Sequence, residues 1–343
     1  MSLPRLGYDP CEGRDAGSPP IEWIPALGCW CVFETGTMTA ILKSTDFATA
    51  DFAEWHRMLA KMGIDCSAVI EILDHVPIAN EGQRHAEIRT AMARCIAAQS
   101  GSTKDTVTET ISVLVPARCR DGQRVDLVRE IIRPVCDTLF ERLLGVPVPS
   151  DEGISASQIF DLYLSLNRRK KIVSKATAML ETYTEAQDRL NIAPGYATSL
   201  RILGYDSIVG SLSGSILHVL EGASGKRLCE IAYPAKLPRT GVPYIERFAA
   251  CDCQVGNAAI KQGDRVRLYL DSGSQGNHAR NGEFHFGRGR HSCLGEDLSS
   301  WLWQTLTAEL AQLPLCFTVE SAVRRKPDWV FAFYDKIVVD FHA

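Results

Sequence analysis

The sequence predicts a mainly α-helical fold with small β-sheets, because two long apolar stripes and several short alternating runs recur along it. Leucines repeat at helical spacing from residue 294 until Pro314 stops the run. A second stripe of the same period predicts a helix over residues 198–221. Shorter runs predict strands and a helix over residues 21–45, strand, turn and strand over 255–270, and a terminal hairpin over 329–341.

The composition excludes several classes of protein. The chain has 343 residues, 45% of them hydrophobic, so it can bury a large core. Its net charge of -4 shows no basic bias, so nucleic acid is not expected as the main partner. Residues 1–20 contain no apolar segment, which predicts neither a signal peptide nor a membrane anchor. The 12 cysteines lack a paired C-x-x-C framework, so most are expected to be reduced and buried in a cytoplasmic protein.

The middle of the chain contains three local signals. A helix predicted over residues 83–98 places His85 and Arg89 four positions apart, on one face. Pro134 is expected near a helix start, since inside a helix it would remove a backbone hydrogen bond. The basic run over residues 168–171 is typical of a solvated helix face and indicates no chemistry by itself.

A glycine-rich loop places one cysteine, Cys293, directly before the leucine stripe. Its glycines allow the backbone to adopt positive φ and to approach a large flat partner. At a helix N-terminus the macrodipole and the free N–H groups favour the thiolate, which is the form that binds a metal. The alternative, a buried structural cysteine, would not require Phe286, His291 and three glycines at these offsets.

This loop resembles the heme-binding loop of the cytochrome P450 family, in which Phe286, Gly287, His291, Cys293 and Gly295 each occupy a family position. The resemblance implies a shortened P450-like fold, forming a single heme-binding domain over residues 1–343. It also implies that Cys293 ligates the iron of heme b and that the other loop residues help to bind the cofactor.

Three further residues resemble propionate-binding residues of the same family. His85 and Arg89 are similar to a pair on the family's propionate-binding helix, although a solvated surface pair is the alternative. Arg247 matches an arginine at the start of a strand that meets a propionate, although a residue at the rim would look the same. His291 is expected to assist them.

The predicted central helix contains Gly204-Tyr205-Asp206-Ser207, which resembles the family's Gly-x-acid-Thr. In the family the acid and the alcohol deliver protons during dioxygen activation, so Asp206 and Ser207 are the candidate catalytic residues. Serine keeps the hydroxyl and loses the methyl group of threonine. The alternative is that both side chains simply face water.

The sequence departs from the family at its Glu-x-x-Arg signature, where the counterpart is Glu230-Ile231-Ala232-Tyr233. The intervals on either side are short, so the loop that this arginine would brace is reduced as well. We interpret the two losses as linked, because an unpaired buried charge is costly.

The resemblance implies a monooxygenase that inserts oxygen from dioxygen into a small organic, biosynthetic substrate. An external electron donor of the ferredoxin or flavodoxin type is expected, because the chain shows no flavin or iron–sulfur segment. Two alternatives remain open. One is a heme-thiolate dehydratase, isomerase or cyclase that needs no dioxygen, and Tyr233 favours it. The other is a non-catalytic heme protein that binds or senses a small ligand.

Overall fold

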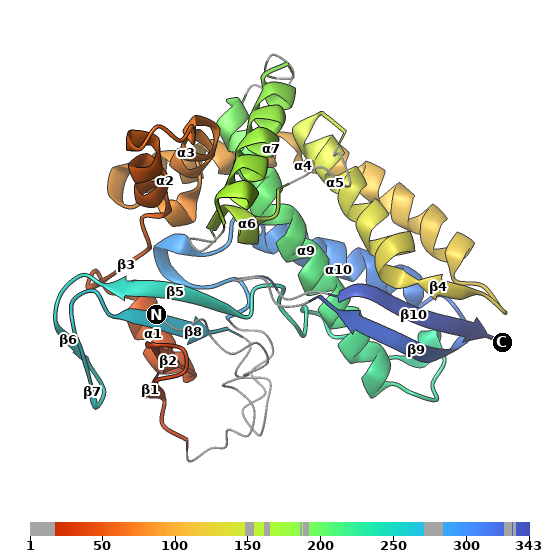
Figure 1. Ribbon diagram of the computed structural model, residues 1–343. Coiled ribbons are helices and arrows are strands. Elements are labelled where there is room, and N and C mark those ends of the chain that lie inside the picture. The colour runs from red at the N-terminus through yellow and green to blue at the C-terminus, as the bar shows by residue number, and fades with distance from the viewer. Residues whose placement is uncertain are drawn as a thin grey trace. The chain divides into compact units, whose positions relative to one another are not determined.

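The computed structural model describes residues 18–147, 154–160, 165–185, 187, 192–270, 284–325, 331 and 334–343 (Figure 1). The chain forms two compact units. The first comprises residues 1–50 and 242–293, and the second comprises 51–241 and 294–343. That these units act as a single heme-binding domain stays a prediction.

The first unit is built on a five-stranded sheet of order β1-β2-β8-β5-β3. Its strands are β1 (Ile21–Ile24), β2 (Cys29–Val32), β3 (Phe47–Ala48), β5 (Tyr244–Ala249) and β8 (Arg265–Tyr269). Only the β2–β8 pair among these is parallel. Helix α1 (Thr35–Lys43) follows β2, which confirms the strands and helix predicted over residues 21–45. A separate hairpin pairs β6 (Cys253–Val255) with β7 (Ala258–Ile260).

Both faces of this sheet bury apolar side chains. On one face Met38, Ile41 and Leu42 of α1 pack with Val266 and Leu268 of β8. The opposite face holds a smaller cluster that consists of Ile24, Leu27, Cys29, Cys31 and Tyr269. Because side chains alternate along a strand, β8 contributes to both clusters. The sheet therefore forms a firm base for the loops at its edges.

The second unit is mainly helical. Its helices are α2 (Phe52–Lys61), α3 (Ser67–Asp74), α4 (Gly82–Arg118), α5 (Arg133–Leu144), α6 (Ala156–Phe160), α7 (Leu166–Glu185), α9 (Pro194–Gly222) and α10 (Glu296–Leu310). Short turns of other helix types are η1 (Pro77–Ala79), η2 (Val128–Ile132) and η3 (Leu228–Glu230). Helices α9 and α10 confirm the two predicted apolar stripes. Pro134 lies in the first turn of α5, as predicted.

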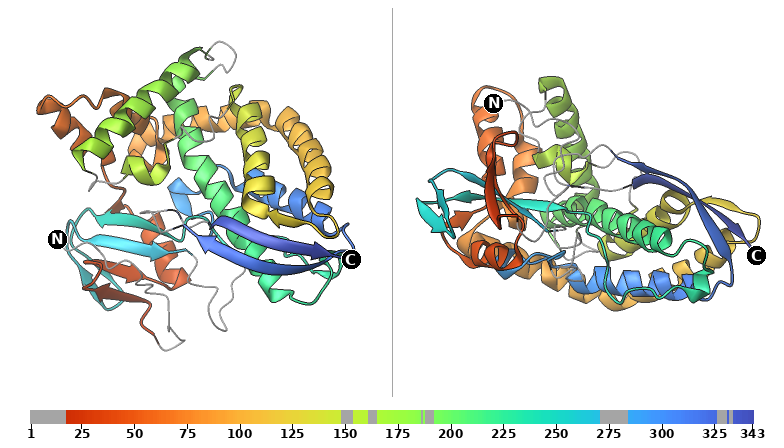
Figure 2. Two further views of the ribbon diagram at one scale, coloured as in Figure 1. Left: turned by 45° about the vertical axis from the view of Figure 1, so that its right-hand side comes forward. Right: turned by 90° about the horizontal axis from the view of Figure 1, so that it is seen from below.

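Helix α4 is much longer than the predicted span of residues 83–98. It continues to Arg118 because buried residues keep the helical period beyond that span, namely Thr103, Val107, Ile111 and Val115. Helix α10 packs against α4 (Figure 2). The leucine stripe of α10 thus finds its apolar partner on a helix that the sequence predicted only in part.

Helix α9 is the central element of the second unit. It contacts α3, α4, α5, α6 and α7 as well as β10 (Tyr334–His342) (Figure 1). Buried residues lie on nearly every face of it, Ala197, Ile202, Val209, Leu212 and Ile216 among them. A helix that is apolar all round belongs in a core. Side chains on α9 therefore meet several other helices at once.

A three-stranded antiparallel sheet completes the second unit in the order β4-β10-β9, with β4 (Arg124–Asp126) and β9 (Cys316–Arg324). The predicted terminal hairpin exists, but its first strand lies earlier than residues 329–341, because β9 begins directly after α10 and its short connection. Residues 329–330 and 332–333 of the predicted hairpin lie outside the described residues. None of the helices within the described ranges is long and apolar enough to cross a membrane.

Candidate functional site

The loop that carries Cys293 is closed by backbone hydrogen bonds within the first unit. The N–H of Gly287 donates to the carbonyl of Phe284 at 2.9 Å, and the N–H of Cys293 donates to the carbonyl of Phe286 at 2.8 Å. Between them lies one 3-10 turn, η5 (Gly289–His291). The Cys293 side chain is exposed at the end of this closed loop.

Two of the three loop glycines have positive φ, as the sequence predicts. The φ angles are 64° for Gly287 and 75° for Gly289. A β-carbon at Gly289 would lie 2.7 Å from the carbonyl oxygen of Leu42 in α1, whereas at Gly287 the nearest atom would be 3.9 Å away. Gly295 differs, because its φ of -93° suits any residue, and it serves as the N-cap of α10. Position 289 therefore requires glycine for both its conformation and its packing.

Arginines hold the same loop in place. The Arg290 guanidinium donates to the carbonyl of Phe47 in β3 at 3.1 Å. The Arg288 guanidinium lies 5.0 Å from the centroid of the Phe284 ring. Together with the contact between α1 and η5, these interactions fix the loop on the base of the first unit.

Cys293 differs from most other cysteines in its exposure. Cys29, Cys31, Cys66, Cys95, Cys119 and Cys136 are buried, as their use as small hydrophobes predicts. Cys293 is exposed and precedes Glu296, the first residue of α10, by three positions. An exposed thiol just before a helix is accessible to a ligand from outside the chain.

These features fit a heme. The loop offers a single soft sulfur donor of the kind that binds heme iron, and Gly287 carries no side chain that would keep a flat group away. The exposed Cys293 is the group that would ligate the metal. Phe286 and His291 lie in the same loop, partly buried.

Arg247 belongs to the same unit as the cysteine loop. It is 7% exposed, and its Nη1 donates to the carbonyl of Glu246 at 2.8 Å. The carboxylate of Glu246 pairs instead with Arg267, at 2.7 Å, on the other face of β5. Arg247 is therefore largely buried within the first unit, and its binding of a propionate stays a prediction.

His85 and Arg89 lie on α4 in the second unit, on one face as predicted. His85 is 5% exposed and Arg89 is partly buried. Ile88 and Met92, on the adjoining face of the helix, are also buried. The pair is thus not the fully solvated one that the alternative interpretation required. Its binding of a propionate stays a prediction.

Asp206 and Ser207 lie on α9, in the same unit, and both are partly buried. The Ser207 hydroxyl donates within its own helix, where the carbonyls of Leu203 and Gly204 are both at 2.9 Å. A β-carbon at Gly204 would lie 2.6 Å from Cζ of Phe140 in α5. The glycine of this motif is therefore required by close packing against α5. The role of Asp206 and Ser207 in proton transfer stays a prediction.

Sequence reasoning missed a polar cluster on the neighbouring face of α9. The Tyr205 hydroxyl donates to the carboxylate of Asp137 in α5 at 2.6 Å, and the Arg201 guanidinium lies 3.7 Å from the centroid of the Tyr205 ring. Burial lowers the pKa of Arg201 and raises the pKa of Tyr205. The i, i+4 spacing of Arg201 and Tyr205 was a local signal. Nothing in the sequence pointed to Asp137 as their neighbour.

Glu230 does not form the brace that its family counterpart provides. Its carboxylate accepts the N–H of Arg227 at 3.0 Å and so caps the short turn η3. The Tyr233 hydroxyl, which stands in place of the arginine, is buried and has no hydrogen-bond partner among the described residues. Burial raises its pKa, and Cys119 adds to the effect. Tyr233 is therefore a neutral phenol within the second unit.

The segment of residues 231–241 is held by neutral hydrogen bonds. The Trp303 indole N–H of α10 donates to the carbonyl of Pro234 at 2.8 Å. Ser215 of α9 bonds both backbone groups of Arg239 at 3.1 Å, and the N–H of Gly241 donates to Ser211 at 2.8 Å. These contacts fasten the segment to α9 and α10, where the sequence had predicted only a loss of the ionic brace.

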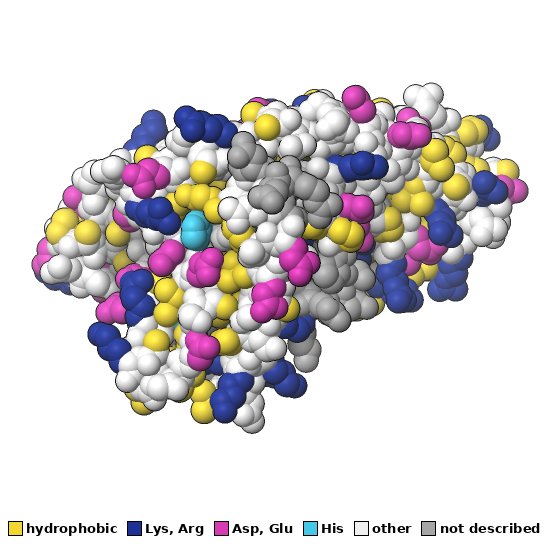
Figure 3. All heavy atoms as spheres, turned by 90° about the horizontal axis from the view of Figure 1, so that it is seen from above, with side chains coloured by type: hydrophobic (Ala, Val, Ile, Leu, Met, Phe, Trp, Pro, Cys, Tyr) yellow, Lys and Arg dark blue, Asp and Glu magenta, His cyan; other side chains and the backbone are white. Residues whose placement is uncertain are grey.

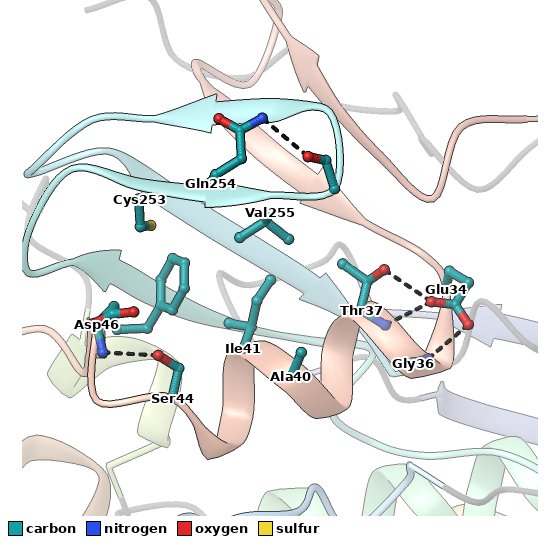
Figure 4. Close-up of a pocket in the computed structure, with 12 residues that line it drawn as sticks. Glu34, Gly36, Thr37, Ala40, Ile41, Ser44, Asp46, Cys253, Gln254 and Val255 are labelled. Carbon is teal, nitrogen blue, oxygen red and sulfur yellow. Dashed lines mark hydrogen bonds between the residues drawn. The ribbon is translucent and has the colours of Figure 1, made fainter.

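The first unit also contains a cavity of about 480 Å³ between α1 and the β6–β7 hairpin (Figure 4). Most polar groups of its lining already form hydrogen bonds. The Glu34 carboxylate accepts from the N–H groups of Gly36 and Thr37, and the Ser44 hydroxyl accepts from the N–H of Asp46. None of the predicted site residues lines it. The cavity is therefore separate from the cysteine loop.

Comparison with known proteins finds the fold and not a sequence relative. No protein-family model and no curated protein matches the chain. Solved structures match almost all of it. P450BioI, in complex with hexadec-9Z-enoic acid ligated acyl carrier protein, is 18% identical with a TM-score of 0.77, covering 94% of each chain. CalO2 is 16% identical with a TM-score of 0.74, covering 94% of this chain and 92% of its own.

A third match is CYP109E1 from Bacillus megaterium in complex with testosterone, 17% identical with a TM-score of 0.72 and 94% of each chain covered. At this level of identity the matches show only that the fold is similar. They confirm the predicted class, mainly α with small β-sheets. This chain therefore has the cytochrome P450 fold.

Proposed function

We propose that the protein is a heme-thiolate monooxygenase that acts on a small organic, biosynthetic substrate. The observation that carries the proposal is the exposed Cys293 thiol at the end of a loop braced by Gly289 and Arg290, in a chain with the cytochrome P450 fold. A structural cysteine would need neither the exposure nor the bracing. The cofactor proposed is heme b.

The residues of the chain divide the proposed work among them. Cys293 would ligate the iron, while Phe286, Gly287, His291 and Gly295 would help to bind the cofactor. His85, Arg89 and Arg247 would bind the propionates through charge-assisted hydrogen bonds. When bound, a thiolate-ligated heme supplies the means to insert oxygen into a C–H bond.

Asp206 and Ser207 would manage protons. Each is partly buried on α9, and a carboxyl and a hydroxyl are both groups that can accept and donate a proton. The Ser207 hydroxyl now donates to its own helix, and a rotation of χ1 would release it for that task.

The partners follow from the same proposal. An external donor of the ferredoxin or flavodoxin type would supply electrons, and the location would be cytoplasmic. The neighbours of the same fold include one solved with an acyl chain on its carrier protein and one solved with testosterone. We propose that this chain likewise takes a lipophilic molecule, either free or tethered to a carrier.

The experiment that tests the proposal is the spectrum of the reduced carbon monoxide complex. The purified protein is expected to bind one heme with a thiolate signature, and Cys293→Ala is expected to lose that signature. Cys251→Ala is the matched control, because Cys251 is also an exposed cysteine of the first unit. A thiolate spectrum that survives in Cys293→Ala would overturn the proposal.

A second function is favoured by one observation, the buried and neutral hydroxyl of Tyr233 at the position of the missing arginine. A heme-thiolate dehydratase, isomerase or cyclase needs no reductant and tolerates loss of the bracing around an electron-donor surface. Conversion of substrate at full rate under argon without reductant would select this alternative. Heme binding without turnover of any substrate would select the non-catalytic binder or sensor.

A further inference from the structure

The first half of α7 presents an unusually basic surface. Arg168, Lys170, Lys171 and Lys175 are accompanied there by no acidic residue, since the first acid of the helix is Glu181. Arg168, Lys170 and Lys171 are exposed, and Lys175 is partly so. We name these four residues the α7 basic face. Helix α7 lies near the top of the view in Figure 1, and Figure 3 shows the molecule from that side.

This charge pattern opposes the stability of its own helix. The carbonyl of Ser165 accepts from the N–H of Arg169 at 3.0 Å, which makes Ser165 the N-cap and Arg168 the third helical residue. That position favours glutamate, which completes a capping box and complements the macrodipole. Arginine there is unfavourable. A face kept only for solubility would have no reason to place cations at this end.

The charges of the α7 basic face are also not neutralised by the part of the chain that the structure describes. None of its four side chains forms an ion pair or hydrogen bond with any residue that the structure describes. Some exposed arginines elsewhere on the second unit do have carboxylate partners, as Arg57 does with Asp51 at 2.6 Å. Unneutralised cations on one helix attract an acidic partner.

The helix beneath this face is firmly held. Arg169, on the inner side of α7, is 5% exposed and its Nη1 lies 3.5 Å from Nε2 of His56 in α2. Helix α7 packs against α3 and α9, and Tyr183 lies within electrostatic reach of Arg201 on α9. A partner bound to the α7 basic face would therefore sit beside the helix that carries Asp206 and Ser207.

We propose that the α7 basic face docks an acidic carrier protein that presents the substrate on a flexible pantetheine arm. The inference rests on the proposed function and names its substrate class, an acyl chain held as a thioester. The exposed Leu166 at the start of α7 adds an apolar contact to the charged ones. Helix α7 contacts α9, the helix on which the candidate proton-transfer residues lie.

The observations favour a carrier over other acidic partners. An electron donor is expected to serve the thiolate of Cys293, whereas α7 packs on α9, the helix that carries Asp206 and Ser207. Nucleic acid is a poor match for a chain of net charge -4. A patch of four cations on one helix is small, so it suits a small acidic protein whose contact surface is of similar extent.

The test measures binding of a bacterial acyl carrier protein that carries a hexadecanoyl chain on its pantetheine arm. The variant Arg168→Glu/Lys171→Glu is expected to bind it about tenfold more weakly at low salt, and the difference should vanish at high salt. Lys226→Glu/Lys236→Glu is the matched control, because it makes the same charge change at exposed sites of the same unit. It is expected to bind as the unmodified protein does.

A second readout separates docking from folding. Arg168→Glu completes a capping box with Ser165, so the α7 variant is expected to melt at an equal or higher temperature than the unmodified protein while binding less. Loss of binding with loss of stability would overturn the proposal. So would equal weakening in both double variants, no salt-dependent binding of the acyl carrier protein, or a preference of this face for a ferredoxin or for anionic lipid vesicles.

The outcome is independent of the heme test. Binding of the carrier protein is measured without turnover, and the carbon monoxide spectrum reports on Cys293 separately. An intact thiolate spectrum with no carrier binding refutes the docking proposal alone. Carrier binding without a thiolate spectrum refutes the proposed function.

Discussion

The hydroxyl of Tyr205 donates a 2.6 Å hydrogen bond to the carboxylate of Asp137 and so joins α9 to α5. The face of the same ring carries the guanidinium of Arg201 at 3.7 Å. One tyrosine on the central helix thus contacts both an acid and a base, immediately before Asp206 in sequence.

Removal of this hydrogen bond is expected to weaken the packing of α5 on α9. Tyr205→Phe should lower the free energy of unfolding by about 1.5–3 kcal/mol, because the bond is made to a charged acceptor. Chemical denaturation measures the change. In a double-mutant cycle with Asp137→Asn, the two changes should be non-additive. Full additivity would show that the contact contributes nothing to stability.

The two positive-φ glycines of the cysteine loop should respond differently to alanine. Gly287→Ala makes only an ordinary contact at 3.9 Å with the His291 carbonyl and is expected to cost about 1–2 kcal/mol for the left-handed backbone alone. Gly289→Ala meets the same conformational cost and also the Leu42 carbonyl at 2.7 Å, so it should cost more and reduce heme retention. Heme content and thermal melting of the two variants measure this. Equal behaviour would contradict the close approach of α1.

Stability should fall in mild acid because of His56. Burial chiefly, and Arg169 in addition, lower the pKa of His56 below its ordinary 6.5, although the Phe52 carbonyl partly offsets them. In the unfolded chain His56 binds a proton as the pH falls below 6.5, while the folded protein resists it. The stabilising contribution is therefore complete above 6.5 and is lost progressively toward the lower folded pKa.

The measurement is the free energy of unfolding between about pH 7 and pH 5. His56→Gln keeps a neutral polar side chain and should flatten the pH slope, by up to about 1.4 kcal/mol for each unit by which the pKa is lowered. The groups that face His56 are the Phe52 carbonyl on its own helix and Arg169 on α7. An unchanged slope in His56→Gln would assign the acid sensitivity to other groups.

Asp206 and Ser207 should affect turnover without affecting cofactor binding. Asp206→Asn is expected to slow product formation by about two to four powers of ten, because it removes a proton-transfer group. Ser207→Ala should divert electrons to peroxide. The ratio of product to dioxygen consumed measures both effects, and the reduced carbon monoxide spectrum controls for heme binding. Full turnover of Asp206→Asn under air would remove Asp206 from the mechanism.

Local signals predicted the elements that matter most for the candidate site. The apolar periods gave α9 and α10, and the glycines marked the cysteine loop, because such patterns act over a few residues. The end of α4 was predicted too early, since its continuation to Arg118 depends on burial against other helices. Position 204 was interpreted as part of a motif, whereas the Phe140 ring explains its glycine.

Contacts between distant segments could not be predicted from the sequence. Asp137 and Tyr205 are separated by 68 positions, and no pattern along the chain joins them. The close approach of the Leu42 carbonyl to Gly289 could not be predicted for the same reason. Each depends on how the helices and strands pack, which a single sequence does not state.

The hydrogen bonds between neutral groups that hold residues 231–241 affect which substitutions the segment can accept. An ionic brace can migrate during evolution, because a reversed charge at one position is compensated by a reversed charge at another. The contact between Gly241 and the carbonyl of Ser207 offers no such exchange, since any β-carbon at 241 meets the backbone of α9. Position 241 is therefore expected to accept only glycine, because added volume there meets the backbone, whereas a position in an ionic brace would accept any residue of suitable charge.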